Sequence, residues 1–117
     1  MTPTARTLRA LKADGWTAEV VERWNPHARV RHDLFNVADI LAVRGRETLA
    51  VQVTAGSCVS ARVAKLRAST ALPLLHCAGW RVEVHGWRRL KVRRGGKAMR
   101  WACRVVDMIG DGASDDD

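Results

Sequence analysis

Three polar residues stand in a largely apolar stretch near the middle of the chain. The stretch reads ADILAVRGRETLAVQVT, and its carboxylate, amide and hydroxyl belong to Asp39, Gln52 and Thr54. A carboxylate beside an amide oxygen and a backbone carbonyl suits a hard divalent cation, because Mg²⁺ prefers oxygen ligands and keeps several waters. We therefore expect Asp39, Gln52 and the Val53 carbonyl to bind Mg²⁺ or Mn²⁺. Such an ion activates water and bears the charge that develops on a phosphodiester.

Two predicted strands position these side chains. Each is a near-continuous apolar run, a pattern typical of strands covered on both faces. Because strand side chains alternate, Gln52 and Thr54 point the same way. A hairpin at Gly45 brings Asp39 close to Gln52 on the same sheet. The two runs span Val37–Val43 and Thr48–Val53.

The N-terminal third predicts a helix and a strand. Thr2 can cap a helix that has Pro3 in its first turn, and Gly15 ends this segment. The alternation of WTAEVVERW predicts a strand over Trp16–Trp24. HARVRHDLFN is less regular and indicates a short strand or loop that leads to Asp39.

The remaining segments complete a single α/β domain. A helical rhythm runs from Val59 to Leu74, and Pro73 is expected to kink or restart that helix. Two further strands are expected on either side of a glycine turn at Gly95-Gly96. A helix between strands implies a parallel crossover, so we expect a mixed central sheet flanked by helices over residues 1–106. Residues 107–117 contain five Asp and no base, which indicates an acidic, flexible tail.

The charge of the chain points to a polyanionic partner. The net charge is +8 over 117 residues, and the segment from Arg81 to Arg104 has nine Lys or Arg against one acid. Nucleic acid is the usual partner of such a surface, and the Trp residues within it can stack on bases. The cations expected to contact DNA are Arg6, Arg9, Arg62, Arg88, Arg89, Lys91, Arg93, Arg94 and Lys97.

The order of elements and the polar residues resemble the PD-(D/E)XK nuclease superfamily. The likeness is to small archaeal-type Holliday junction resolvases and related phage proteins, whose signature is an Asp at one strand and Glu-x-Lys on the next. VADILAVRGRETLAVQVT has this spacing, and the resemblance spans roughly residues 3 to 90. It implies a restriction-endonuclease-like fold and a Mg²⁺- or Mn²⁺-dependent hydrolase. Such an enzyme cuts duplex or branched DNA in recombination as a homodimer.

Two residues depart from this signature. Gln52 stands at the Glu position and brings no charge, while Thr54 stands at the Lys position and supplies no cation. The resemblance makes Asp39, Gln52, Thr54 and Lys65 the candidate catalytic residues, because Lys65 on the crossover helix can replace the missing Lys.

Other residues can fill the remaining gaps in the signature. Arg62, three residues before Lys65, is an alternative source of the cation. The first helix has no acid before Asp14, so the carboxylate that the family places on that helix is absent, and Glu19, Glu22 or Asp33 can supply one instead.

Other classes of function stay open. A catalytically impaired DNA-binding module on the same fold would keep the cations without the chemistry. A phage-type protein-interaction module would use the Trp-rich surface instead. No stretch approaches the roughly 18 apolar residues of a membrane span, so we expect no membrane partner and a cytoplasmic location.

Overall fold

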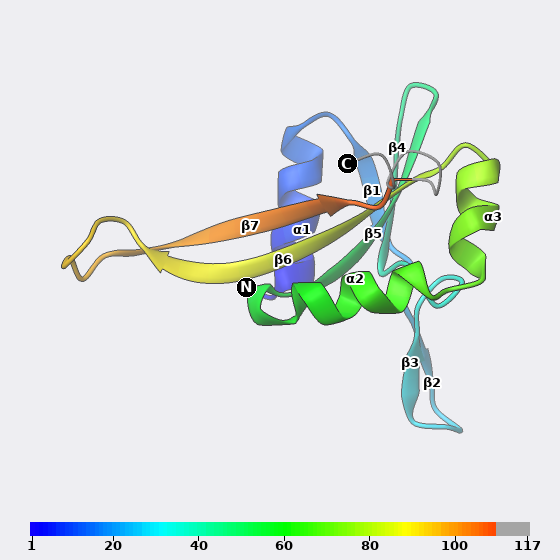
Figure 1. The fold of residues 1–117 in the computed structure, drawn as a ribbon, viewed down its shortest axis with the longest axis horizontal. Helices are drawn as coiled ribbons and strands as arrows, with labels where there is room; N and C mark the ends of the chain where they lie inside the picture. The colour runs from blue at the N-terminus through cyan, green and yellow to red at the C-terminus, as the bar shows by residue number, and fades with distance from the viewer. Residues whose placement is uncertain (110–117) are drawn as a thin grey trace.

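A computed structural model describes residues 1–109 as helices on both faces of a mixed sheet. The five-stranded sheet has the order β1-β4-β5-β6-β7, and β2 and β3 form a separate hairpin (Figure 1). The α/β fold class expected from the sequence is confirmed. The elements are α1 (Pro3–Ala13), β1 (Thr17–Val20), β2 (Arg23–Asn25), β3 (Val30–His32), β4 (Ile40–Arg44), β5 (Glu47–Ala55), the 3₁₀ turn η1 (Gly56–Cys58), α2 (Val59–Arg67), α3 (Ala71–Cys77), β6 (Arg81–Lys91) and β7 (Met99–Asp107).

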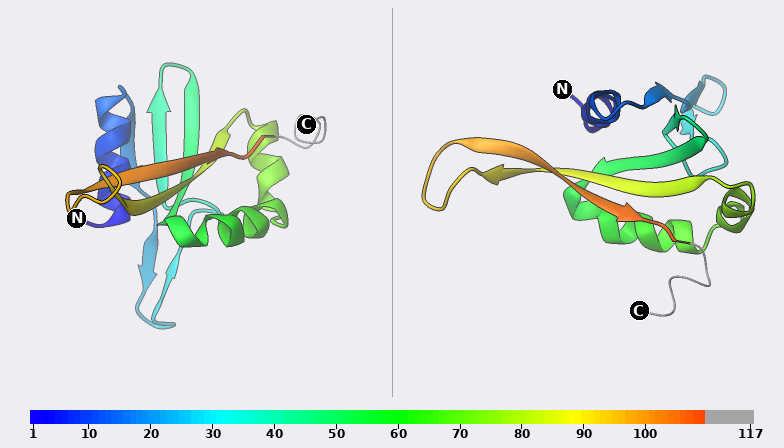
Figure 2. Two further views of the ribbon diagram at one scale, coloured as in Figure 1. Left: turned by 60° about the vertical axis from the view of Figure 1, so that its left-hand side comes forward. Right: turned by 90° about the horizontal axis from the view of Figure 1, so that it is seen from above.

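Strand directions follow from the connections. β4 and β5 are antiparallel and joined by a tight turn in which Gly45 has φ 58°, a conformation that glycine adopts without a Cβ clash. The α2–α3 crossover makes β5 and β6 parallel. β6 and β7 form a long antiparallel hairpin whose outer half protrudes beyond the helices (Figures 1 and 2).

The alternation along β5 separates two hydrophobic layers. Leu49, Val51 and Val53 face α1, together with Trp16 and Ile40. The residues between them face α2 and α3, where Ala50 belongs to a second hydrophobic cluster. Figure 2 shows α1 on one side of the sheet and α2 and α3 on the other. Gln52 and Thr54 are therefore buried on the α2 side. The other buried members of this second cluster are Val37, Ala38, Val59, Leu66, Leu72, Leu75, Val82, Val84 and Met108.

Two predicted elements are each divided in the structure. The strand predicted over Trp16–Trp24 is interrupted at Val21 and Glu22, where the chain leaves the sheet to form the β2–β3 hairpin. The alternating pattern continues across this break, so the periodicity alone did not reveal it.

The predicted crossover helix also restarts. It ends at Arg67 and resumes as α3 at Ala71, with Pro73 in the first turn of α3, where a missing N–H costs no helical hydrogen bond. At the C-terminus, β7 runs through Asp107 and Met108 is 3% exposed, so packed chain continues past the boundary expected at 106. The rest of the expected tail, residues 110–117, lies outside the described residues.

Gly86 allows α2 to lie directly on β6. A Cβ at this position would overlap Val59 Cγ2 and come within 3.3 Å of Gly56 Cα, and Val59 is only 1% exposed. We expect Gly86→Ala to lower the free energy of unfolding by about 2 kcal/mol, as overpacking does in other cores. The loss, measured by urea denaturation, should be smaller in a Val59→Ala background. Equal losses in both backgrounds would contradict this explanation.

Candidate functional site

The structure brings Asp39 and Gln52 into direct contact. Gln52 Nε2 donates a hydrogen bond to Asp39 Oδ2 at 2.9 Å, and the Val53 backbone N–H donates to the same oxygen at 2.8 Å. Asp39 is 5% exposed and Gln52 is 1% exposed. The carboxylate and the amide expected on neighbouring strands therefore meet in the interior.

A shift in strand pairing produces this contact. Ile40 is paired with Val51, yet the Asp39 N–H also donates to the Val51 carbonyl at 2.9 Å, so two residues oppose one, as in a β-bulge. The Val53 N–H is left to bond the Asp39 side chain. The N–H and C=O of one strand residue point to the same side. The Val53 carbonyl accordingly points toward the side of Asp39, where the β4 ladder has ended.

Two further acids complete a cluster around Asp39. Oxygens of Glu22, Asp33 and Asp39 all lie within 4.8 Å of one another. Glu22 directly precedes β2 and Asp33 directly follows β3, so both stand at the base of the β2–β3 hairpin. Gln52 Nε2 also lies 3.3 Å from Asp33 Oδ2 and so links two members of this acidic cluster.

A tight turn returns the chain from β3 to Asp39. Phe35 and Asn36 have φ values of 56° and 58°, and an isolated bridge pairs Leu34 with Ala38. The Asn36 N–H donates to the Asp33 carbonyl at 3.1 Å, which fixes the start of the turn. Asparagine tolerates the left-handed conformation better than most residues, whereas Phe35 adopts it at a steric cost. The turn thus holds Asp33 against Asp39.

The environment of Asp39 disfavours its charge. Burial, followed by the neighbouring Asp33 carboxyl, raises the pKa of Asp39 to about 7, although the Val53 and Gln52 hydrogen bonds act in the opposite direction. Glu22 is compensated by Arg31, whose Nη1 lies 2.9 Å from Glu22 Oε1. Asp39 and Asp33 have no such cation in contact with them within residues 1–109, so their negative charge is only partly offset.

Gln52 carries a second sign of an incomplete site. Its Oε1 is buried and has no hydrogen-bond partner among the described residues. Buried polar atoms are almost always paired, so an exception calls for an explanation. Turning the amide over would direct Oε1 toward the acids in place of Nε2. The orphaned oxygen, the acids and the Val53 carbonyl form a set of hard oxygen ligands that fits a divalent cation.

The other predicted catalytic residues, Thr54 and Lys65, make no hydrogen bond or ion pair with these acids within residues 1–109. Thr54 is buried on the same side of β5 as Gln52 and makes no side-chain hydrogen bond within residues 1–109. Lys65 is exposed on α2 and Arg62 is half-buried there, and neither forms an ion pair with a described acid. The cation that does contact the acidic cluster is Arg31, which the sequence analysis did not select.

Six of the nine predicted DNA-contacting cations lie in the second half of β6 and in the turn that joins it to β7, and Figures 1 and 2 show this end of the hairpin protruding beyond the helices. All six are exposed, and none forms an ion pair with a described acid. Arg6 on α1 stacks 4.0 Å from the ring centroid of Trp101, which pairs with Arg89 toward the turn end of this hairpin, and Arg9 is exposed on the same helix. The six are Arg88, Arg89, Lys91, Arg93, Arg94 and Lys97.

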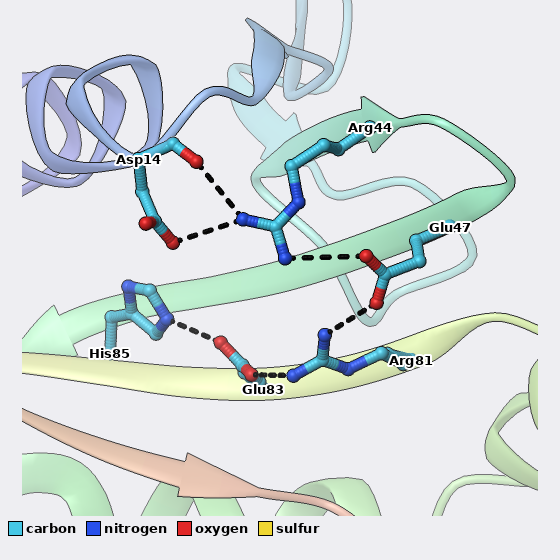
Figure 3. A network of polar contacts seen from close by, with 6 residues as sticks. All are labelled: Asp14, Arg44, Glu47, Arg81, Glu83 and His85. Carbon is cyan, nitrogen blue, oxygen red and sulfur yellow. Dashed lines mark hydrogen bonds and ion pairs between the residues drawn. The ribbon is translucent and has the colours of Figure 1, made fainter.

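A separate polar network lies on the α1 side of the sheet (Figure 3). Arg44 bonds Asp14 and Glu47, Arg81 bonds Glu47 and Glu83, and the ring of His85 lies 2.9 Å from Glu83.

A further hydrogen bond joins α1 to the sheet beside this network, because Thr7 Oγ1 accepts from Trp87 Nε1 at 2.8 Å. Together these contacts connect α1 and its C-cap to three strands, so we assign the network a role in holding the fold together.

Comparisons of the chain with protein-family profiles, curated protein sequences and solved structures found no significant match. Among residues 1–109, no helix has the length and apolar content needed to cross a bilayer.

Proposed function

We propose that the protein is a divalent-metal-dependent DNA endonuclease. The observation that carries the proposal is the buried contact between Asp39 and Gln52 within the acidic cluster. Glu22, Asp33 and Asp39 would hold Mg²⁺ or Mn²⁺, joined by the Val53 carbonyl and by Gln52 Oε1 once its amide turns over. Such an ion, when bound, polarises a phosphodiester and lowers the pKa of water.

The residues around the ligands have distinct tasks. Asp39 is held in place by the Val53 N–H, so a ligand atom is fixed before substrate arrives. The Glu22 side chain is 21% exposed, so it would hold the ion at the solvent side of the cluster. Arg31, paired with Glu22, places a guanidinium at the rim, where it would stabilise charge developing on the phosphate. In this proposal Arg31 replaces Lys65 as the catalytic cation.

The arrangement of elements supports the resemblance to PD-(D/E)XK nucleases. The chain has an N-terminal helix, three antiparallel strands, a helical crossover and a parallel fourth strand, with Asp39 at the second strand and Gln52 on the third. The insertion of β2–β3 and the addition of β7 leave this order intact. A restriction-endonuclease-like fold, and action as a homodimer on branched DNA, belong to the proposal.

DNA binding is assigned to the β6–β7 hairpin. Its unpaired cations would contact phosphates, and such contacts release counterions and make affinity fall steeply with salt. Replacing Arg88, Arg89 and Lys91 together with glutamine should weaken binding and flatten the salt dependence, because each phosphate contact contributes to the slope.

One observation favours a second candidate, a DNA-binding module without catalysis. Gln52 Nε2 already donates to Asp39 and Asp33, so the amide partly compensates the acids without an ion. Thr54 adds no cation. In this alternative the hairpin binds DNA with the same salt dependence, and chelation of metal changes nothing.

Cleavage assays separate the two candidates. The full chain is incubated with a labelled four-way junction and with a paired duplex, in Mg²⁺, Mn²⁺ or EDTA. The endonuclease predicts cuts that require the metal, whereas the binding module predicts salt-sensitive binding without cuts. Absence of binding to either DNA at low salt would contradict both.

A further inference from the structure

The β2–β3 hairpin is a second exposed arm, and it stands on the acidic cluster. Arg23 is paired with His32 at one end of its two strands, and Asn25 is paired with Val30 at the other. The hairpin projects away from the main sheet (Figure 1). Two of the three clustered acids, Glu22 and Asp33, directly flank it in the chain. The hairpin therefore begins and ends beside the acidic cluster.

The composition of the hairpin suits a polyanion. Residues 23–32 contain three Arg and two His and no acid. Trp24 is 59% exposed, which is unusual for so large an apolar side chain. A hollow of about 350 Å³ on this hairpin is lined by Arg23, Trp24, Asn25, Pro26 and His32.

Trp24 belongs to the same surface as the acids. It lies opposite Arg31 in the hairpin register, and Arg31 bonds Glu22 at 2.9 Å, so this ion pair sets Glu22 on the Trp24 side. Trp24 follows Glu22 by two residues, which span about 7 Å of extended chain, so the backbone of Trp24 lies close to the edge of the acidic cluster. A base against this ring would belong to a nucleotide adjacent to the phosphate at the acids.

We propose that Trp24 stacks on an unpaired base of the DNA strand whose phosphate reaches the acidic cluster. The inference rests on the proposed endonuclease function and names its substrate class: DNA with unpaired nucleotides beside the cleaved phosphate. Bases within a continuous duplex are covered on both faces and must be flipped out at an energetic cost, whereas an unpaired base offers a free face to an aromatic ring. Arg31, which shares the face of Trp24, holds the neighbouring phosphate.

Binding to two matched DNA probes tests the inference. Fluorescence anisotropy is measured in EDTA with a fully paired duplex and with the same duplex carrying a short unpaired gap. The wild-type protein should bind the gapped duplex more tightly. Trp24→Leu, which keeps bulk but not the aromatic face, should weaken binding to the gapped duplex by about tenfold, while paired-duplex affinity stays within about twofold. Trp24→Phe should retain part of the preference.

A control variant and the cleavage assay distinguish failure of the stacking inference from failure of the endonuclease proposal. Val30→Ala removes another exposed apolar side chain, 43% exposed, from the opposite face of the hairpin, and should leave both affinities unchanged. If Trp24→Leu binds the gapped duplex like wild type, the stacking inference is overturned, while metal-dependent cleavage by the wild type would keep the endonuclease standing. If the wild type binds neither DNA, both proposals fall.

Discussion

Asp39→Asn is expected to reduce metal-dependent cleavage by about a thousandfold. The substitution removes one charge from the centre of the acidic cluster and leaves the volume and the Val53 hydrogen bond in place. Losing one charged group aimed at a reaction centre typically costs 10²- to 10³-fold in rate. Glu19→Gln is the matched control, because Glu19 is exposed on β1 and forms no ion pair within residues 1–109. Undiminished cleavage by Asp39→Asn would contradict the assignment.

The same substitution should stabilise the metal-free fold at neutral pH. The pKa of Asp39 rises from 3.8 to about 7 on folding, so between these values the folded protein binds more protons than the unfolded chain, and stability falls as pH rises. Above pH 7 the free energy of unfolding of the parent is lower by up to about 4 kcal/mol for this reason. Asp39→Asn has no such titration, so urea denaturation should show the variant to be more stable than the parent at pH 8, and this difference should be absent at pH 4.

Hydrogen bonding in the Asp39→Asn variant supports this expectation. The oxygen of the introduced amide, placed at the position of Asp39 Oδ2, would still accept from the Val53 N–H and from Gln52 Nε2. Equal pH dependence of parent and variant would show that Asp39 is ionised in the fold without difficulty. The cluster would then have no need of a cation.

The Asp39–Gln52 contact was predictable because it depends on local rules. Strand alternation and a hairpin at Gly45 suffice to bring the two side chains together, and the apolar runs on either side fix the register. The mixed sheet followed in the same way, from a helical rhythm lying between strands. The one-residue shift at Asp39 is not encoded in any periodicity, yet it decides that the Val53 N–H meets the carboxylate.

The rest of the cluster depends on tertiary placement. Glu22 and Asp33 lie eleven positions apart, and only the β2–β3 excursion between them brings their carboxylates to Asp39. Their signal in the sequence was weak: two isolated acids before the first apolar run. Lys65 was selected because helix spacing directs it toward the sheet, but it is exposed and Arg31 contacts the acids instead. Contacts between side chains that are brought together by such a hairpin produce no periodic pattern in a single sequence.

Gln52→Glu should strengthen metal binding by at least about tenfold and make the fold depend on metal. The change replaces the donor to Asp39 and Asp33 with a fourth carboxylate at a position that is 1% exposed. A buried charge without a partner costs several kcal/mol. In EDTA at neutral pH the variant should therefore unfold at a lower temperature than the parent.

Added Mn²⁺ should restore this loss, because an ion that binds only the folded state stabilises it by mass action. Gln52→Leu supplies the contrast: it also removes the donor but adds no ligand, so Mn²⁺, held only by the three acids that remain, should raise its unfolding temperature less than that of Gln52→Glu. Cleavage distinguishes the two proposed functions in the same samples. A gain in rate with Gln52→Glu supports an endonuclease limited by weak metal binding, whereas tighter metal binding without cuts supports a module that lacks the remaining catalytic groups. If Mn²⁺ rescues neither variant, the carboxylates do not form a metal site.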